Sequence, residues 1–355
     1  MIDRQAILTV LETVQDPVHN ASVVAANMVS GLVIKEDAIG FALEVDPKRG
    51  QEAEPLRKET EDALKTAFPQ HKITVVLTAH NQTPKMSTER KQLAQPEQNG
   101  LVDVQHVIAV ASGKGGVGKS TVAVNLAAAL AAQGLNVGLL DADIYGPSVP
   151  KMVGKHQRAE LTDDKLIQPH TAQGMAVMSM GFMVDEDAPL VWRGPMVISA
   201  IRQMLYQVKW GALDVLVVDM PPGTGDAQLT LSQRAPLDGV VIVTTPQDIA
   251  LIDARKGIEM FKKMDVSILG LVENMSVFTC PSCGHEEHLF GCDGGKSMAD
   301  QLGIPLLGQI PLNLDIRTLS DDGKPMIQHA KDHAASSLFA GMAQTIWDGV
   351  KKKDT

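Results

Sequence analysis

Cysteine is scarce in this chain of 355 residues, and the three that occur, Cys280, Cys283 and Cys292, lie within one short segment. An odd number of closely spaced cysteines does not make a disulfide framework. In a reducing compartment, neighbouring cysteines more often belong to metal or redox chemistry. The segment is therefore a candidate metal or redox site.

Positive charge and long apolar runs are also lacking. The formal net charge is −10, which argues against nucleic-acid binding because phosphate backbones favour a basic surface. No run is long and apolar enough to span a bilayer. The first residues, MIDRQAILTVLETVQDP, carry acids where a signal peptide has a basic start. We therefore expect a cytoplasmic protein with no nucleic-acid or membrane partner.

The pattern of residues 1–80 predicts a small α+β domain. Helical spacing occurs in RQAILTVLETV and LRKETEDALKTAF, GLVIKEDAIGFALEV indicates a hairpin, and KITVVLTA indicates a strand. The stretch that follows is polar and contains prolines and glutamines, so residues 81–103 are interpreted as a linker.

Residues 104–355 predict an α/β fold. Short runs rich in Val, Ile and Leu alternate with helical stretches: HVIAVAS, NVGLLDAD, DVLVVDM, GVVIVTTP, ILGLVENM and PLLGQIP. Continuous apolar strands separated by helices indicate a mostly parallel sheet with helices on both faces.

The stretch GKGGVGKS, Gly113 to Ser120, matches the phosphate-loop pattern G-x-x-x-x-G-K-[ST] between a predicted strand and a predicted helix. Its glycines let backbone N–H groups surround phosphate oxygens at a helix N-terminus. Lys119 is predicted to contact the β- and γ-phosphates of ATP, and the Ser120 hydroxyl to bind Mg²⁺. The predicted nucleotide-binding residues here are Gly113, Lys114, Gly115, Gly116, Val117, Gly118, Lys119, Ser120 and Thr121.

A second lysine, Lys114, precedes the one that the loop requires. It could reach a nucleotide held by a facing subunit and neutralise charge during phosphoryl transfer. It could equally be a solvated lysine that only adds positive potential. The residues alone leave both interpretations open.

Three acids end predicted strands: Asp141 and Asp143 in GLLDAD, and Asp219 in VLVVDM. The carboxyl ends of parallel strands face the ligand crevice. Asp219 suits the role of holding Mg²⁺ through water, and Asp143 could orient or deprotonate the attacking water. Helix N-capping is the alternative for each, but three such acids together favour function.

The segment CPSCGHEEHLFGC offers two thiolates at C-x-x-C spacing, Cys280 and Cys283, followed by His285, His288 and Cys292. One subunit could bind zinc with both cysteines and two of the other three side chains. Alternatively, two subunits could each provide one cysteine pair. A thioredoxin-like dithiol is disfavoured because the pair follows a strand, in a loop.

The loop KGGVGKST resembles the deviant Walker A loop of the ParA/MinD-type ATPases. In that class the first lysine contacts the nucleotide across an ATP-sandwich dimer. The resemblance therefore implies a homodimer, in which Lys114 acts on the partner's ATP as a catalytic residue with Lys119 and Asp143.

The same resemblance assigns further segments. It places Asp141 and Asp143 in switch I, and Asp219 to Gly225 in switch II. Asn274 and Pro311, the latter within the segment IPLN, match the positions where that class holds the adenine ring.

A closer resemblance is carried by the order of the motifs: the deviant loop, DADIYGPSVP, WRGPM at Trp192–Met196, DMPPGTGD, ENMS and CPSCG. This order is similar to that of the Mrp/ApbC family of iron–sulfur cluster carrier ATPases. There, the cysteines of two protomers bridge a [4Fe–4S] cluster, which implies that Cys280 and Cys283 are ligands. Cys292 matches no ligand position, and His285 and His288 are interpreted as solvated loop residues.

The N-terminal segment resembles the small domain of many bacterial members, which also occurs in iron–sulfur assembly factors. Its Asp16-Pro17 matches an Asp-Pro pair that lies early in that domain. It lacks the reactive cysteine that stand-alone relatives often carry. Docking or regulation is therefore favoured over direct cluster handling for residues 1–80.

The leading hypothesis is an ATPase that holds a [4Fe–4S] cluster at a dimer interface and transfers it to apoproteins, with iron–sulfur assembly proteins as partners and slow ATP hydrolysis. One alternative is a MinD/ParA-like positioning ATPase, for which LFAGMAQTIWDGVKKKDT could supply an interfacial helix, although a helix docked on the core is favoured. The other is a zinc-stapled nucleotide-binding module.

Overall fold

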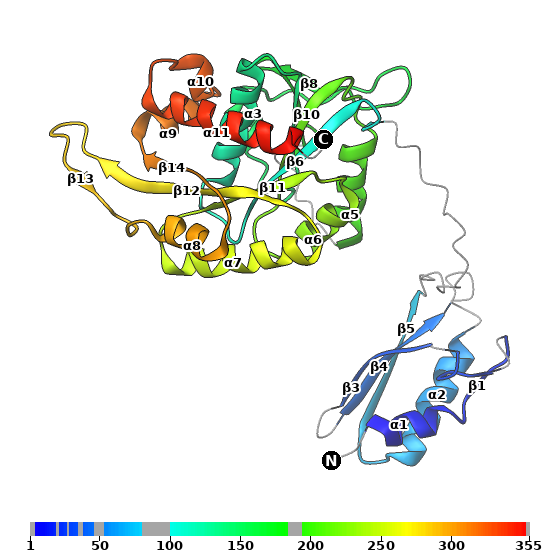
Figure 1. The fold of residues 1–355 in the computed structure, drawn as a ribbon. Helices are drawn as coiled ribbons and strands as arrows, with labels where there is room; N and C mark the ends of the chain where they lie inside the picture. Colours follow the sequence, from blue (N-terminus) through cyan, green and yellow to red (C-terminus); the bar gives the residue numbers. More distant parts are fainter. Residues whose placement is uncertain are drawn as a thin grey trace. The chain divides into compact units, whose positions relative to one another are not determined.

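The computed structural model describes residues 4–18, 21–26, 28–34, 38–45, 53–79, 100–183 and 194–352 (Figure 1). The chain divides into two compact units, Met1–Leu93 and Ala94–Thr355, and each has its own hydrophobic core. The predicted linker lies outside the described residues as far as residue 99.

The first unit is a small α+β domain, as predicted. Strand β4 (Ala38–Val45) lies between β3 (Val29–Ile34), to which it is antiparallel, and β5 (Lys72–Ala79), to which it is parallel. Helix α2 (Glu54–Ala67) contacts β5 and α1 (Arg4–Leu11), and β1 (Gln15–Asp16) pairs with β2 (Ala21–Ser22). Apolar side chains from the two helices and the sheet form its core, including Ile7, Leu11, Phe41, Leu43 and Leu64.

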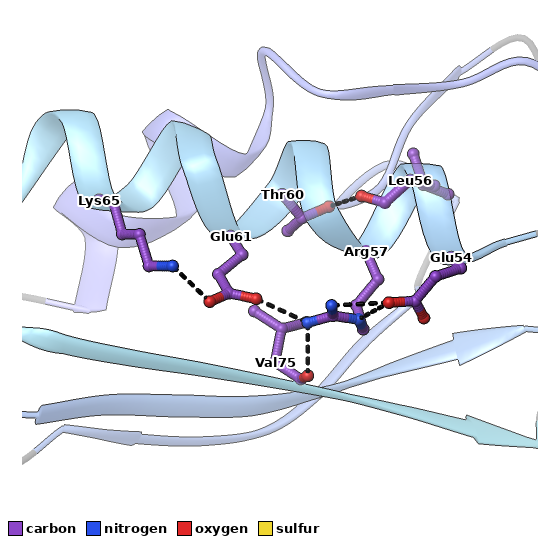
Figure 2. Close-up of polar contacts among 7 residues, drawn as sticks. All are labelled: Glu54, Leu56, Arg57, Thr60, Glu61, Lys65 and Val75. Atoms are coloured by element: carbon purple, nitrogen blue, oxygen red, sulfur yellow. Dashed lines mark hydrogen bonds and ion pairs between the residues drawn. The ribbon is translucent and has the colours of Figure 1, made fainter.

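A polar network joins α2 to β5 (Figure 2). The Arg57 guanidinium donates to Glu54 at 2.8 Å, to Glu61 at 2.6 Å and to the carbonyl oxygen of Val75 at 3.5 Å. Lys65 donates to the other carboxylate oxygen of Glu61 at 2.5 Å. The helical partners are three and four residues apart, which places them on one face of the helix. Within this network, the hydrogen bond to Val75 links the helix face to strand β5.

The second unit is built on a nine-stranded sheet in the order β13-β12-β11-β6-β10-β7-β9-β8, with β14 beside β12. The pairs β8–β9 and β12–β13 are antiparallel and the others are parallel. The strands are β6 (Val104–Ser112), β7 (Val137–Asp141), β8 (His170–Ala172), β9 (Met175–Ser179), β10 (Leu213–Asp219), β11 (Gly239–Thr244), β12 (Ile268–Thr279), β13 (Glu286–Glu287) and β14 (Leu306–Leu312).

Helices cover both faces of this sheet, with α3 and α11 on one side and α7 and α8 on the other (Figure 1). The helices are α3 (Lys119–Ala132), α4 (Val149–Met152), α5 (Gly194–Tyr206), α6 (Asp226–Arg234), α7 (Asp248–Lys263), α8 (Gly294–Leu302), α9 (Leu314–Asp321), α10 (Met326–His329) and α11 (Ala334–Lys351). The mostly parallel α/β architecture is therefore confirmed.

All six strands predicted from apolar runs are present, whereas β8, β9 and β13 were not predicted. β13 has only two residues, both glutamates and both exposed, so its sequence carries no strand pattern. β9 (MAVMS) is nearly fully buried beside β7, but its methionines give no β-branched signal.

The C-terminal helix α11 is docked on the core. Phe339, Met342 and Ile346 are buried, and the helix contacts α3 and β14. The apolar face that could have served an interfacial helix is thus used in packing. Within the described ranges, no helix is both long enough and apolar enough to cross a membrane.

Candidate functional site

The predicted loop and acids meet at one edge of the large sheet. β10 lies between β6 and β7 and is parallel to both, and the register pairs Asp219 with Asp141 and with Val110. The loop Gly113–Ser120 leaves β6 at this edge and enters α3 at Lys119. Parallel strands therefore bring together acids that are far apart in the sequence.

The loop conformation depends on glycine. Gly116 and Gly118 have φ of 82° and 83°, which lies in the left-handed region that favours glycine. A Cβ on Gly118 would lie 2.2 Å from Asn274 Nδ2. That amide donates to the carbonyl oxygen of Val117 at 2.8 Å. Asn274 therefore fixes the loop from strand β12, which is separated from β6 by β11.

Lys119 is buried at the centre of the site. Its amine donates to Asp219 Oδ1 at 2.5 Å and lies 3.3 Å from Ser120 Oγ and 4.0 Å from Asp143 Oδ2. Asp219 is fully buried, and its Oδ2 has no hydrogen-bond partner among the described residues. Burial raises the pKa of both Asp219 and Asp143. The unpaired oxygen of Asp219 and the hydroxyl of Ser120 are oxygen ligands of the kind that Mg²⁺ prefers.

Asp141 holds the segment that follows β7. Its Oδ1 accepts from the amide of Asp143 at 3.1 Å, and its Oδ2 accepts from the amide of Val149 at 3.2 Å and from Ser179 Oγ at 2.9 Å. Both ends of residues 143–149 are therefore tied to one carboxylate. Ser179 was missed by the sequence analysis because it lies at the end of β9, a strand that was not predicted.

The nucleotide-free protein is expected to lose stability as the pH rises from about 4 toward 7. Burial, reinforced by the charge of Asp219, raises the pKa of Asp141 from 3.8 to about 7. The folded state then binds a proton that the unfolded state has lost, so the free energy of unfolding falls through this window by about 1.4 kcal/mol per pH unit for one proton. Urea unfolding across this range measures the slope. Asp141→Asn should flatten it by about one proton, and an unchanged slope would contradict this assignment.

Two adjoining pockets lie beside the loop. The first, of about 210 Å³, is lined by loop residues with Asp143, Ser148 and Pro222. The second, of about 220 Å³, is lined by Asn274, Pro311, Asn313 and neighbouring side chains. Gly118, Thr121 and Met152 line both. Seven of the nine loop residues predicted to hold the nucleotide line the first pocket, all except Gly113 and Val117, and the residues predicted to hold adenine line the second.

Lys114 differs from Lys119 in its surroundings. It is half-buried and lines the first pocket. Its carbonyl oxygen accepts from Ser112 Oγ at 2.8 Å, but no carboxylate of the described residues forms an ion pair with its amine. The charge of Lys114 is therefore not neutralised within the described part of this chain.

Cys280 and Cys283 lie in the turn between β12 and β13, a hairpin that projects beyond the helices (Figure 1). Cys280 is half-buried and Cys283 is exposed. Hydrogen bonds from the amides of Ser282 and Cys283 lower the pKa of the Cys280 thiol. A thiolate at this position can therefore bind a soft metal. Elsewhere in the segment, His285 Nε2 lies 3.2 Å from Glu287 Oε2, while the side chains of His288 and Cys292 face each other.

Within the described ranges, no three or more His, Cys, Asp or Glu side chains are grouped so that they could hold one metal ion. Trp192 and Arg193 of the WRGPM motif lie outside the described residues. Met196 of the same motif is exposed on α5.

Comparison with known proteins gives consistent matches. A ParA family model, described as NUBPL iron-transfer P-loop NTPase, matches residues 103–347, and a model of iron–sulfur cluster assembly proteins matches residues 4–77. An iron–sulfur cluster carrier protein of Synechocystis is 44% identical over 351 residues, which cover 98% of this chain and 97% of that protein. The iron–sulfur cluster transfer protein NUBPL of Mus musculus is 58% identical over 247 residues, covering 68% of this chain and 77% of that protein.

Two solved structures are similar in fold. A nucleotide-binding protein of Archaeoglobus fulgidus in complex with ADP gives a TM-score of 0.57 at 41% identity, covering 63% of this chain and 89% of that chain. The cell division ATPase MinD of Pyrococcus furiosus gives 0.54 at 21% identity, covering 69% and 99%, and this likeness concerns the fold alone.

Proposed function

Because the chain belongs to the family of NUBPL iron-transfer P-loop NTPases, we propose that it is an ATP-dependent carrier of a [4Fe–4S] cluster, which it delivers to recipient apoproteins in the cytoplasm. The observation that carries the proposal is the Cys280–Cys283 pair, half-buried and exposed respectively, on the hairpin of a P-loop ATPase unit. The full-length relatives named as cluster carriers support it.

The cluster is shared by two copies of the chain in this proposal. A [4Fe–4S] cluster is commonly held by four cysteine thiolates, and the hairpin offers two. A dimer axis through the site would supply the other two symmetrically. The hairpin projects from the unit (Figure 1), so its cysteines are accessible both to a partner copy and to an acceptor protein.

In this proposal, the nucleotide bound at the phosphate loop controls whether the cluster is retained. The Lys119 amine donates to Asp219 Oδ1 at 2.5 Å. When ATP binds, its phosphates would attract Lys119, and the Asp219 carboxylate and the Ser120 hydroxyl would then be available to hold Mg²⁺. Mg²⁺ would neutralise the phosphate charge. Asp143, already fixed through Asp141, orients the attacking water.

Lys114 completes the site across the dimer. Its amine, which has no ion pair in its own chain among the described residues, would neutralise the charge that develops on the partner's triphosphate. Nucleotide state would then alter the geometry in which the two hairpins meet, and hence the retention of the cluster. Hydrolysis is expected to be slow because it resets this switch. The N-terminal unit, residues 1–80, would serve docking or regulation.

Metal analysis of protein isolated without oxygen tests the proposal. We expect about two irons and two sulfides per chain, with broad visible absorbance at about 400 nm, and transfer of both to an apoprotein acceptor. Stoichiometric zinc without colour would contradict the carrier function and favour a zinc-stapled nucleotide-binding module.

A further inference from the structure

His288 and Cys292 face each other in the segment that follows β13, although the proposed function uses neither. Cys292 Sγ lies 3.8 Å from His288 Nε2, and His288 Nδ1 lies 3.0 Å from the carbonyl oxygen of Ser276. Because a carbonyl oxygen only accepts hydrogen bonds, Nδ1 carries the proton. The lone pair of Nε2 is therefore directed to the side where the sulfur lies.

This is the arrangement of a metal-binding histidine. Such histidines usually donate their other ring N–H to a carbonyl or carboxylate, which fixes the tautomer and the ring orientation. Metal bonds of about 2.3 Å to sulfur and about 2.0 Å to nitrogen, at a near-tetrahedral angle, place the two donor atoms about 3.5 Å apart. The observed separation fits this geometry with little movement. We propose that His288 and Cys292 form a second metal site, which binds a divalent ion of the Fe²⁺ or Zn²⁺ class.

The imidazole is anchored to the sheet rather than to the loop. Ser276 lies on β12, is buried, and donates through its hydroxyl to the carbonyl oxygen of Ile310 on β14 at 3.1 Å. Next to the pair, Asp293 is held by the Gln309 amide at 2.9 Å. Its negative charge favours a bound cation. Burial and this charge also raise the pKa of the Cys292 thiol, so metal binding would have to release the thiol proton.

The pair is distinct from Cys280 and Cys283. The hairpin register pairs Phe278 with Glu287 and Thr279 with Glu286, so Cys280 lies in the turn, and the Ser276 anchor of His288 lies on the other side of that pairing. Two protein ligands leave the remaining positions to water or to an incoming thiol, so the ion would be exchangeable.

Cobalt binding tests the site in the full-length chain carrying Cys280→Ser and Cys283→Ser, where Cys292 is the only thiol. We expect one Co²⁺ per chain with a thiolate-to-cobalt charge-transfer band. Cys292→Ser should abolish the band, and His288→Ala should weaken binding by at least about 10-fold. His285→Ala is the matched control, since this exposed histidine of the same segment faces Glu287 instead, and it should bind as the parent does.

A parent chain without the charge-transfer band, or a band and affinity unchanged in His288→Ala, would overturn the site. Alkylation of Cys292 gives a second readout: Co²⁺ should slow it in the parent and in His285→Ala but not in His288→Ala. Since the cluster cysteines are absent from all these variants, the outcome is independent of whether the chain carries a cluster.

Discussion

Lys119→Ala is expected to weaken MgATP binding by about 100-fold or more, because each lost charge-assisted hydrogen bond to phosphate costs roughly 1.5–3 kcal/mol. Lys119 is buried between the loop and Asp219, and among the described residues Lys114 is the only other lysine that lines the phosphate pocket. Equilibrium binding of a fluorescent ATP analogue measures the effect. Binding within a few fold of the original protein would contradict the assignment of Lys119 to the phosphates.

The same substitution leaves Asp219 buried without its partner, so folding must be checked. Burial already raises the pKa of Asp219, and we expect the carboxyl to take up a proton in the variant rather than to unfold the unit. Circular dichroism and thermal unfolding should therefore show a folded protein. This result would separate loss of binding from loss of structure.

Lys114→Ala is the matched control within the same loop. It should bind MgATP about as tightly as the original protein, because Lys119 still contacts the phosphates. Its steady-state hydrolysis should fall by about 100-fold or more, since a charge supplied across an interface acts mainly on the transition state. Unchanged turnover in Lys114→Ala would remove the trans-acting role and leave Lys114 as a solvated lysine.

Cys280→Ser and Cys283→Ser should each abolish stable cluster binding, the second large effect that we expect. A chain with one remaining thiolate contributes two ligands to a dimer instead of four, which is insufficient for a [4Fe–4S] cluster held by cysteines. Anaerobic reconstitution followed by iron and sulfide analysis measures the loss. Cys280, whose thiol pKa is lowered by two backbone amides, and Cys283 should prove equally necessary.

Cys292→Ser is the control for these variants. Cys292 is exposed like Cys283 but lies outside the hairpin turn, so its replacement should leave cluster content and absorbance unchanged. A cluster lost equally in Cys292→Ser would assign a ligand role to Cys292 and contradict the symmetric arrangement of two pairs.

The nucleotide site was predictable because its parts are local or follow from parallel pairing. The loop pattern determines its own backbone, with positive φ at Gly116 and Gly118. Asp141 and Asp219 come together because β7 and β10 are parallel neighbours whose ends meet at one edge. Asn274 and Pro311 were assigned through a family resemblance, and the structure places both on one pocket wall.

The contacts that the sequence did not reveal depend on strand pairings that its residue pattern does not show. Ser179 reaches Asp141 only because β9 lies beside β7. The approach of His288 to Cys292 requires the β12–β13 hairpin, since the ring is oriented by Ser276, twelve residues earlier in the chain. Spacing alone predicted a solvated loop residue, and His288 is indeed exposed, but its contact with the Ser276 carbonyl oxygen depends on the hairpin.

In the proposed function two copies of the chain meet, each contributing a cysteine pair to one cluster and a lysine to the other's ATP. Native mass spectrometry of the anaerobically reconstituted protein with ATP and Mg²⁺ determines whether they do. We expect a particle of two chains that carries one [4Fe–4S] cluster and two nucleotides. A single chain that retains both cluster and ATP would contradict it.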